Sequence, residues 1–342
     1  MRVLIAGLLL ALLVACTPPN GDVASSAEEA EQARVVVYTS RQPHLIEPLF
    51  QRYTASTGVQ VDFTSDNEAS LIERLAAEGA RTSADVFITV DAGNLWHAAD
   101  RGLLRAIDSE SLVDAIPASL RDEQNQWFGL SQRARVIVYH RGRVDAGELS
   151  TYEDLADPRW RGRLCLRSSR KVYNQSLVAL MIEHLGEERS EEIVRGWVAN
   201  LATNPYASDT QTIEAVAAGR CDVAIVNTYY LARLQSDDPD YPVSVFWPNQ
   251  DSTGVHVNIS GAGVTRHAPR PGQGQALIEW LASDQAQGEF AERNHEFPAN
   301  PAVPAADLIR GWGEFRADDT PLVIAGQRQA QAVRLMDRAG YR

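Results

Sequence analysis

The stretch "WFGLSQRARVIVYHRGRV", residues 127–144, decides the fold because it breaks the pattern that precedes it. From residue 34 onward, apolar strand segments such as "RVVVYTS" alternate with amphipathic helix segments such as "HLIEPLFQRYTASTG". This alternation predicts a mainly parallel sheet with helices on both faces. In the quoted stretch, a long strand from Arg135 to Tyr139 has no helix directly before it. We therefore interpret it as a crossing between two lobes.

Beyond this crossing, the chain resumes its mixture of helices and strands and then crosses back. The segments "NQSLVALMIEHLG" and "SEEIVRGWVANLA" have the spacing of helices around a second sheet, and we interpret "VHVNISGAGVTRHAP" as the return crossing. We predict an α/β fold with two lobes, each a mixed, mainly parallel sheet flanked by helices, with the ligand in the interlobe cleft. The expected boundaries are 34–134 for the first part of the N-lobe, 135–260 for the C-lobe, and 261–342 for the return to the N-lobe with the C-terminal helices.

The N-terminal segment "MRVLIAGLLLALLVACTPPN" has the pattern of an export signal. Its apolar run, residues 3–15, is too short to span a bilayer. The residues before Cys16 look like a lipoprotein cleavage box, so we expect a lipoprotein signal peptide over 1–15 and a lipid on Cys16; ordinary cleavage near the alanine is the alternative. Residues 16–33, rich in Pro, Ser, Ala and Glu, are expected to form a flexible linker. These features predict a periplasmic or cell-envelope protein that is lipid-anchored to a membrane.

The composition excludes one class of partner. The chain has 45 Asp and Glu against 32 Lys and Arg, giving a formal charge of -13, and it contains no basic stripe. Nucleic-acid binding, which needs concentrated positive charge, is therefore not expected. About 310 residues follow the linker, which is enough for two domains of ordinary size.

Two cysteines remain once Cys16 is assigned to the lipid, and they stand in similar settings. Cys165 precedes Tyr173 by eight residues, and Cys221 precedes Tyr229 by eight. Two neighbouring strands with this common offset would be joined at one end and would present tyrosines at the other. Because an exported protein lies in a compartment that permits disulfides, we expect a Cys165–Cys221 disulfide; two reduced, buried cysteines are the alternative. Zinc and CxxC redox sites do not fit, since no cysteines or histidines cluster at the required spacing.

The tyrosines suggest a metal site. In "CDVAIVNTYYLARL", residues 221–234, an apolar strand runs directly into Tyr229 and Tyr230. Neighbouring strand residues point to opposite faces, so packing rarely favours such a pair, although a core tyrosine beside a rim tyrosine is the alternative. With Tyr173 at the matching offset, several phenols are expected where the predicted strands end and a ligand would lie. A hard trivalent cation such as Fe(III) prefers oxygen ligands and can hold a phenol deprotonated, despite a usual pKa of about 10.

Several segments together resemble the periplasmic ferric-ion-binding proteins that supply iron-uptake ABC transporters. The similar segments are "VVVYTSRQPHLIEPLF", "EGARTSADVFITVDAG", "QWFGLSQRARVIVY", "YNQSL", "NTYYLARL", "HVNISGAGV" and "NHEFPANP". They extend over nearly all of the chain from Val35 onward, and they are specific in combination rather than singly. The resemblance implies the two-lobe type II periplasmic binding protein fold, Fe(III) as the bound ion, and an ABC transporter permease in the inner membrane as the partner.

The resemblance also implies roles for individual residues. Tyr173, Tyr229 and Tyr230 match the tyrosines that bind Fe(III) in the family. Many members add a histidine, or a histidine and a tyrosine, from the first loop; here a glutamine and a proline occupy those places. His44, one residue later, is a candidate ligand; the alternative is a helix N-terminal residue near the cleft. The "RQP" sequence resembles the subgroup that uses three tyrosines and completes the coordination with carbonate or another small anion. The residues expected to face this anion are Arg41, Gln42, Arg133, Arg135 and Asn227.

We therefore expect a monomeric, lipid-anchored substrate-binding protein of an iron-uptake transporter and not an enzyme. Fe(III) would be held by tyrosinates, with carbonate or bicarbonate as the synergistic anion. The alternative is a small organic ligand in the same cleft, such as an organic anion, a polyamine or a thiamine-like compound, because two-lobe folds bind many ligands. An exported hydrolase is disfavoured, since Ser168 and Ser169 lie in no GxSxG motif and no pattern places a histidine beside them.

Overall fold

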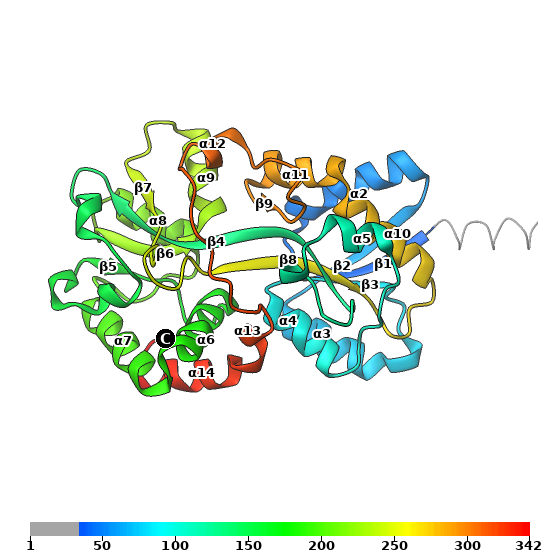
Figure 1. Ribbon diagram of the computed structural model, residues 1–342, viewed down its shortest axis with the longest axis horizontal. Coiled ribbons are helices and arrows are strands. Elements are labelled where there is room, and N and C mark those ends of the chain that lie inside the picture. Colours follow the sequence, from blue (N-terminus) through cyan, green and yellow to red (C-terminus); the bar gives the residue numbers. More distant parts are fainter. Residues whose placement is uncertain (1–33) are drawn as a thin grey trace, which may run out of the picture.

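The structure is a computed structural model that describes residues 34–342. Figure 1 shows two α/β lobes side by side, joined by the strands β4 and β8, which run from one lobe to the other. The expected signal peptide over 1–15, the lipid attachment at Cys16 and the linker to residue 33 lie outside the described residues. Within residues 34–342, every helix is too short or too polar to cross a membrane.

The N-lobe is built on strands in the order β2-β1-β3-β8-β4. Strand β1 (Arg34–Thr39) pairs in parallel with β2 (Gln60–Ser65) and with β3 (Val86–Val90), and β8 lies antiparallel to β3. The apolar runs of β1 and β3 are almost fully buried, as expected for parallel strands covered on both faces. The helices of this lobe are α2 (Pro43–Thr57), α3 (Glu68–Glu78), α4 (Ala92–Asp100), α5 (Glu110–Ala115), α10 (Pro271–Ala282) and α11 (Asp284–Asn294).

The C-lobe has a smaller sheet centred on β6 (Val223–Asn227), all of whose residues are buried. Strand β5 (Leu164–Cys165) lies parallel to β6, and β4 lies antiparallel to both β6 and β7 (Val243–Phe246). The helices of this lobe are α6 (Val172–Leu185), α7 (Glu187–Asn200), α8 (Asp209–Ala217) and α9 (Thr228–Asp237).

The crossing strands explain why the sequence pattern changes at residues 127–144. Strand β4 (Phe128–His140) pairs with β8 (Val257–Val264) as far as Ala134, and from Arg135 onward it pairs with β6. One continuous strand therefore belongs to both sheets, and no helix is needed before its C-lobe half. The predicted fold, two α/β lobes joined by crossing strands, is confirmed, and the strand is longer than the sequence indicated.

The C-terminal segment departs from the expected boundary, because it does not stay on the N-lobe. After β9 (Phe297–Pro298), which pairs with β4, the chain passes through α12 (Asp307–Arg310) and α13 (Ile324–Gln327) to α14 (Gln329–Arg338). Figure 1 shows this red segment running back across the molecule to lie beside α6 and α7. The apolar residues of α14 are buried in the C-lobe core, which explains the return. The expectation that residues 261–342 end on the N-lobe is therefore wrong for this last part.

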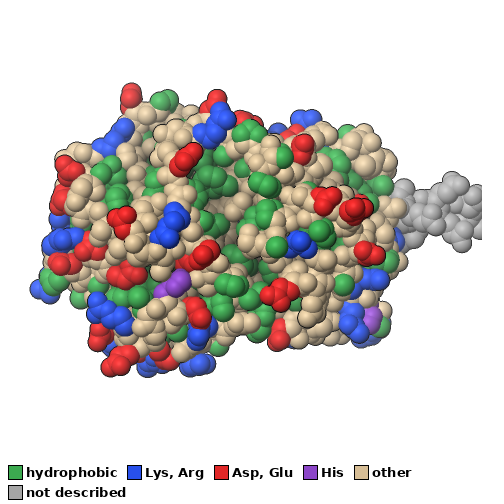
Figure 2. Space-filling model, viewed as in Figure 1, with side chains coloured by type: hydrophobic (Ala, Val, Ile, Leu, Met, Phe, Trp, Pro, Cys, Tyr) green, Lys and Arg blue, Asp and Glu red, His purple; other side chains and the backbone are tan. Residues whose placement is uncertain are grey.

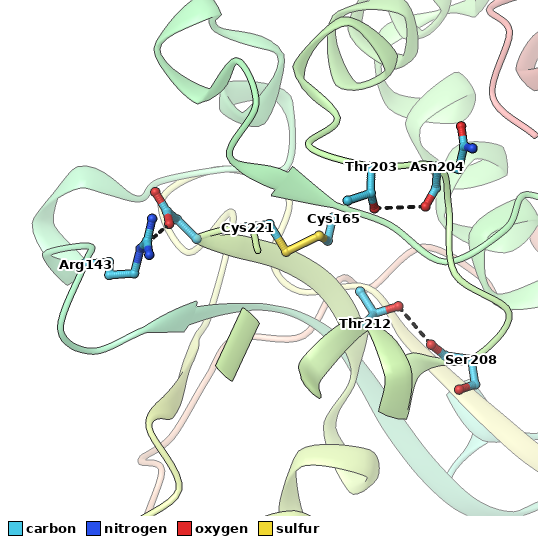
Figure 3. The surroundings of a disulfide bond; sticks show 8 residues. Arg143, Cys165, Thr203, Asn204, Ser208, Thr212 and Cys221 are labelled. Carbon is cyan, nitrogen blue, oxygen red and sulfur yellow. Dashed lines mark hydrogen bonds and ion pairs between the residues drawn. A yellow bond between two sulfur atoms is a disulfide. The ribbon is translucent and has the colours of Figure 1, made fainter. Parts of the chain in front are cut away.

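The predicted disulfide is confirmed. Figure 3 shows Cys165 of β5 bonded to Cys221, which lies just before β6, with a Sγ–Sγ distance of 2.04 Å. Both cysteines are buried, and their Cα atoms are 5.9 Å apart. Because β5 and β6 run parallel, the segments that follow them leave the sheet at the same edge. The tyrosines eight residues beyond each cysteine can therefore meet there.

Charges of both signs are mixed on the surface. Figure 2 shows Lys and Arg interspersed with Asp and Glu over the visible face of both lobes, without a continuous basic band. Many of these side chains pair with one another, as Arg338 does with Glu187 and Glu191. This face therefore offers no surface suited to a nucleic acid, in keeping with the formal charge of -13.

Candidate metal centre

The structure brings the three predicted tyrosines together at the boundary between the lobes. The hydroxyl oxygens of Tyr173 and Tyr229 are 3.4 Å apart, and the ring of Tyr230 lies 4.2 Å from that of Tyr229, centroid to centroid. Tyr173 and Tyr229 are 6% and 4% exposed. Val90 of the N-lobe packs in the same cluster as Tyr173 and Tyr230. The phenols therefore come from the C-lobe, and the N-lobe covers them.

All three tyrosines lie in the first turn of a helix. Tyr173 is the second residue of α6, while Tyr229 and Tyr230 are the second and third residues of α9. The first turn of a helix has unpaired backbone N–H groups and the positive end of the helix dipole, both of which favour negative charge. Neither cap residue, Lys171 of α6 nor Asn227 of α9, caps its helix through its side chain. Both helix ends therefore favour phenolate at the positions where these tyrosines stand.

Without a cation, however, the phenols of Tyr229 and Tyr230 are held neutral. Burial raises the pKa of Tyr229 well above its usual value of 10.0, and the neighbouring Tyr173 and Tyr230 raise this pKa further. Burial is also the main reason why the pKa of Tyr230 is raised. A multivalent cation among the hydroxyls would reverse this balance, because it supplies the dominant local charge.

Cationic side chains surround the ring of Tyr173. The guanidinium of Arg133 lies 5.0 Å from the ring centroid, that of Arg167 lies 5.6 Å from it, and the ammonium of Lys171 lies 4.9 Å from it. Arg133 is 2% exposed and donates one hydrogen bond, to Ser260 at 3.1 Å. Its Nε and its other terminal nitrogen have no hydrogen-bond partner among residues 34–342. Such a buried, underused guanidinium is suited to a small oxyanion, which it can bind through two parallel hydrogen bonds.

Arg135, by contrast, is already occupied inside the C-lobe. It pairs with the buried Asp209 at 3.3 Å and donates to the side-chain carbonyl oxygens of Asn227, at 3.0 Å, and of Asn174. Arg167 shares the same Asp209 carboxylate at 3.2 Å. The amide nitrogen of Asn227 is buried and has no partner in the described part of the chain. Arg135 therefore orients Asn227, whose amide is left as the available donor.

The other two predicted anion residues lie on the N-lobe. Arg41 is 1% exposed, forms an ion pair with Glu296 at 2.8 Å, and lies over the ring of Phe290. Gln42 is exposed at the start of α2 and does not cap this helix through its side chain. Within residues 34–342, no hydrogen bond or ring contact connects either residue to the three tyrosines. The structure thus gives Arg41 an ion-pair partner of its own and leaves Gln42 in solvent.

His44 is exposed on α2, and the charge of Arg233 acts on it. The guanidinium of Arg233 lies 5.2 Å from the centroid of the Tyr229 ring. Partial burial, followed by the charges of Arg233 and Arg41, lowers the pKa of His44 from 6.5. A neutral imidazole is the form that can bind a metal, so His44 has the right protonation state for a ligand. The sequence had not singled out Arg233, Arg167 or Asp209, because nothing distinguishes them from other charged residues before the fold is known.

The donor set fits a hard trivalent cation. Residues 34–342 contain no cluster of three His, Cys, Asp or Glu side chains that could hold a metal, so the oxygens of the tyrosines are the donors in question. Oxygen donors suit hard cations, whereas thiolate and imidazole suit softer ones. Three phenolates would also balance the charge of Fe(III). Neither Ser168 nor Ser169 hydrogen-bonds to a histidine in the described part of the chain.

The chain is similar to known iron-uptake and iron-binding proteins. Iron uptake protein A1 of Synechocystis sp. is 40% identical to this chain, covering 97% of it and 93% of that protein. A Trichodesmium structure in complex with iron and citrate ligands is 43% identical, with a TM-score of 0.84, covering 90% of this chain and all of that one. Ferric iron-binding protein A of Mannheimia haemolytica, solved in an open conformation, is 36% identical, with a TM-score of 0.81, covering 90% and 98%.

The family comparison covers both lobes. The family model described as bacterial extracellular solute-binding protein matches residues 81–310, which is more than half of the chain. This range includes both crossing strands and all three tyrosines. The chain therefore belongs to the family of bacterial extracellular solute-binding proteins.

Proposed function

We propose that this protein is the extracytoplasmic Fe(III)-binding component of an iron-uptake ABC transporter. The observation that carries the proposal is the convergence of Tyr173, Tyr229 and Tyr230, with two hydroxyls 3.4 Å apart, at two helix N-termini between the lobes. The iron uptake protein of Synechocystis sp. and the iron-bound structure from Trichodesmium support this choice of ion. An organic ligand would not require three converging phenols.

The phenols bind Fe(III) as phenolates. In the proposed site, each phenol loses its proton to water as its oxygen bonds the ion, and the helix N-termini stabilise the resulting phenolates. A small oxyanion, carbonate in our proposal, completes the coordination and is held by the unpaired nitrogens of Arg133 and the amide of Asn227. Closure of the N-lobe over the tyrosines, with β4 and β8 as the flexible connection, then excludes water from the ion. The open conformation of the Mannheimia relative supports this hinge movement.

The proposal extends to the rest of the transport cycle. The closed, loaded protein docks as a monomer on an ABC transporter permease in the inner membrane, where opening of the lobes releases the ion. In this proposal, a lipid on Cys16 keeps the protein at a membrane surface. Its role is to bind and deliver, so it needs no catalytic group.

A visible absorption titration tests this proposal. We expect Fe(III), added as a weak chelate to the purified protein, to produce a tyrosinate-to-iron charge-transfer band in the wild type, and bicarbonate to strengthen the band. Because the Arg133 nitrogens would hold the anion, Arg133→Met should lose the bicarbonate dependence and bind iron about 10- to 100-fold more weakly, as expected for lost charge-assisted hydrogen bonds. His44→Ala tests whether a histidine is a ligand. If the band is unchanged in this variant, the anion and not His44 completes the coordination of the iron. A folded wild type that stays colourless, and whose melting temperature iron does not raise, would refute the ferric function.

A further inference from the structure

In addition to the crossing strands and the packing of Val90 against the tyrosines, polar contacts on helix α6 join the lobes. The ammonium of Lys171 donates to the carboxylate of Glu68, on α3 of the N-lobe, at 2.9 Å. One turn further, the hydroxyl of Ser176 donates to the carboxylate of Asp91, at the start of α4, at 2.6 Å. The same first turn of α6 carries Tyr173. The helix that supplies one of the proposed iron ligands is therefore also the helix that the N-lobe contacts.

A third connection reaches α6 through the C-terminal segment. The side chain of Gln329 donates to Gln175 at 3.0 Å and is hydrogen-bonded to His97, on α4, at 2.7 Å. Gln329 belongs to the segment that returns to the C-lobe, and the neighbouring helix α13 packs against both α4 and α6. The start of α6 is thus in contact with the N-lobe both directly and through this segment.

Lys171 differs from the other members of this contact because it touches a proposed iron ligand. It is the cap residue of α6, two positions before Tyr173, and its ammonium lies 4.9 Å from the centroid of the Tyr173 ring. The side chains of Lys171 and Glu68 are 28% and 19% exposed, so their ion pair is less screened than one in open solvent. Lys171 is also the chain's single lysine among 32 basic residues. A compact ammonium can contact a ring face and a carboxylate together, whereas the wider planar guanidinium has a different shape.

We propose that Lys171 is a positioning residue that couples lobe closure to iron coordination through its ion pair with Glu68. When the N-lobe closes, Glu68 holds Lys171, which fixes the first turn of α6 and keeps the hydroxyl of Tyr173 beside that of Tyr229. When the lobes separate, Lys171 loses its partner, and Tyr173 is the ligand whose support weakens first. Release would then begin at Tyr173, while Tyr229 and Tyr230 still hold the ion. This inference rests on the proposed iron-binding function and adds the order in which the tyrosines dissociate from the iron.

The rate of iron release tests the coupling. Iron-loaded protein is mixed with a strong chelator, and the loss of the charge-transfer band is followed over time. We expect Lys171→Met and Glu68→Gln each to release iron about fivefold faster, in line with the contribution of one partly buried ion pair. The double variant should be no faster than either single one, because both remove the same bond. The exchanged pair, Lys171→Glu with Glu68→Lys, should recover most of the slow release, and Lys171→Arg should retain part of it.

The matched control is an ion pair that joins no lobes. Arg101 pairs with Glu73 at 2.6 Å; both residues belong to the N-lobe and line the same pocket as Lys171 and Glu68. Arg101→Gln should therefore leave the release rate unchanged. If Lys171→Met and Glu68→Gln load iron with the normal band and release it at the wild-type rate, the coupling is wrong while the iron-binding function stands. A wild type without the band would instead overturn the function itself.

The single lysine allows a second, independent readout. An amine-reactive reagent modifies Lys171 and the N-terminal amine, and peptide mass spectrometry separates the two sites. Because closure pairs Lys171 with Glu68, iron should slow the modification of Lys171 severalfold in the wild type and much less in Glu68→Gln. Equal modification rates with and without iron would show that Lys171 does not follow closure and would overturn the proposal.

Discussion

At the scale of single residues, Tyr229 matters most to the proposed metal site, because its hydroxyl meets that of Tyr173 and its ring contacts the tilted ring of Tyr230. Tyr229→Phe removes one of the three proposed oxygen ligands and keeps the ring. We expect iron affinity to fall by at least about a hundredfold, since even the outer partners of metal ligands contribute about 10- to 100-fold. Chelator competition measures this loss.

Tyr38→Phe is the matched control for this prediction. Tyr38 is also buried, but its hydroxyl donates to Glu78 of the N-lobe at 3.0 Å and belongs to no phenol cluster. Its substitution should lower stability by about 1–2 kcal/mol and leave iron affinity intact. Equal iron affinity in Tyr229→Phe and the wild type would contradict the assignment of ligands.

Arg135 provides a prediction about stability, because the structure pairs it with Asp209 inside the C-lobe. Arg135→Leu leaves a buried carboxylate with Arg167 as its remaining ionic partner, so we expect a loss of about 3 kcal/mol in the free energy of unfolding, measured by urea denaturation. Adding Asp209→Leu should restore part of this loss. If Arg135→Leu keeps its stability and instead loses the bicarbonate dependence of iron binding, Arg135 is an anion ligand after all.

At the scale of elements, the Cys165–Cys221 disulfide fastens β5 to β6 below the tyrosines. It closes a loop with a sequence separation of 56, for which the chain-entropy model gives about 4 kcal/mol of stabilisation. We expect the double variant Cys165→Ala/Cys221→Ala to lose up to about that amount in urea denaturation. Since the helices α6 and α9 keep their own packing, iron binding under native conditions should persist. An unchanged unfolding curve would show that the disulfide does not constrain the unfolded chain in this way.

His256, which lies just before the return strand β8, should make the free energy of unfolding depend on pH. Burial lowers its pKa from 6.5 to about 3, despite the opposing charge of Asp318. Below pH 6.5, His256 binds a proton in the unfolded chain but stays neutral in the folded protein. The stability present above pH 6.5 is therefore lost as the pH falls toward 3. Between pH 6.5 and pH 5, the wild type should lose about 1.5 kcal/mol more unfolding free energy than His256→Gln, as measured by urea denaturation. Parallel pH profiles for the two proteins would contradict this explanation.

The elements near the site show how far local pattern could carry the prediction. The switch from β6 to α9 at Asn227 was readable, because apolar residues give way there to a helical pattern. The ion-pair partners of the arginines could not be predicted from sequence. Whether Arg41 binds an anion or pairs with Glu296 depends on a contact between residues 255 positions apart. The same holds for Arg135 and Asp209. Sequence pattern therefore predicted the phenols, which sit at element ends, better than the charged groups around them.

At the scale of the whole molecule, sequence pattern could not predict that the C-terminal segment returns to the C-lobe. The apolar stripe of α14 requires a partner surface, but a stripe alone does not say which lobe supplies it. In the structure its residues Ala332, Leu335 and Met336 join the core of α6 and α7. The chain thereby passes between the lobes a third time, after β4 and β8, and any opening of the lobes must move this segment as well.

The most direct test of the central claim is a crystal structure of the iron-loaded protein with an anomalous difference map recorded at the iron absorption edge. The account predicts one strong iron peak per molecule, within bonding distance of the hydroxyl oxygens of Tyr173, Tyr229 and Tyr230, with non-protein density between the iron and Arg133. Iron bound elsewhere, or bound without these three oxygens, would contradict the account.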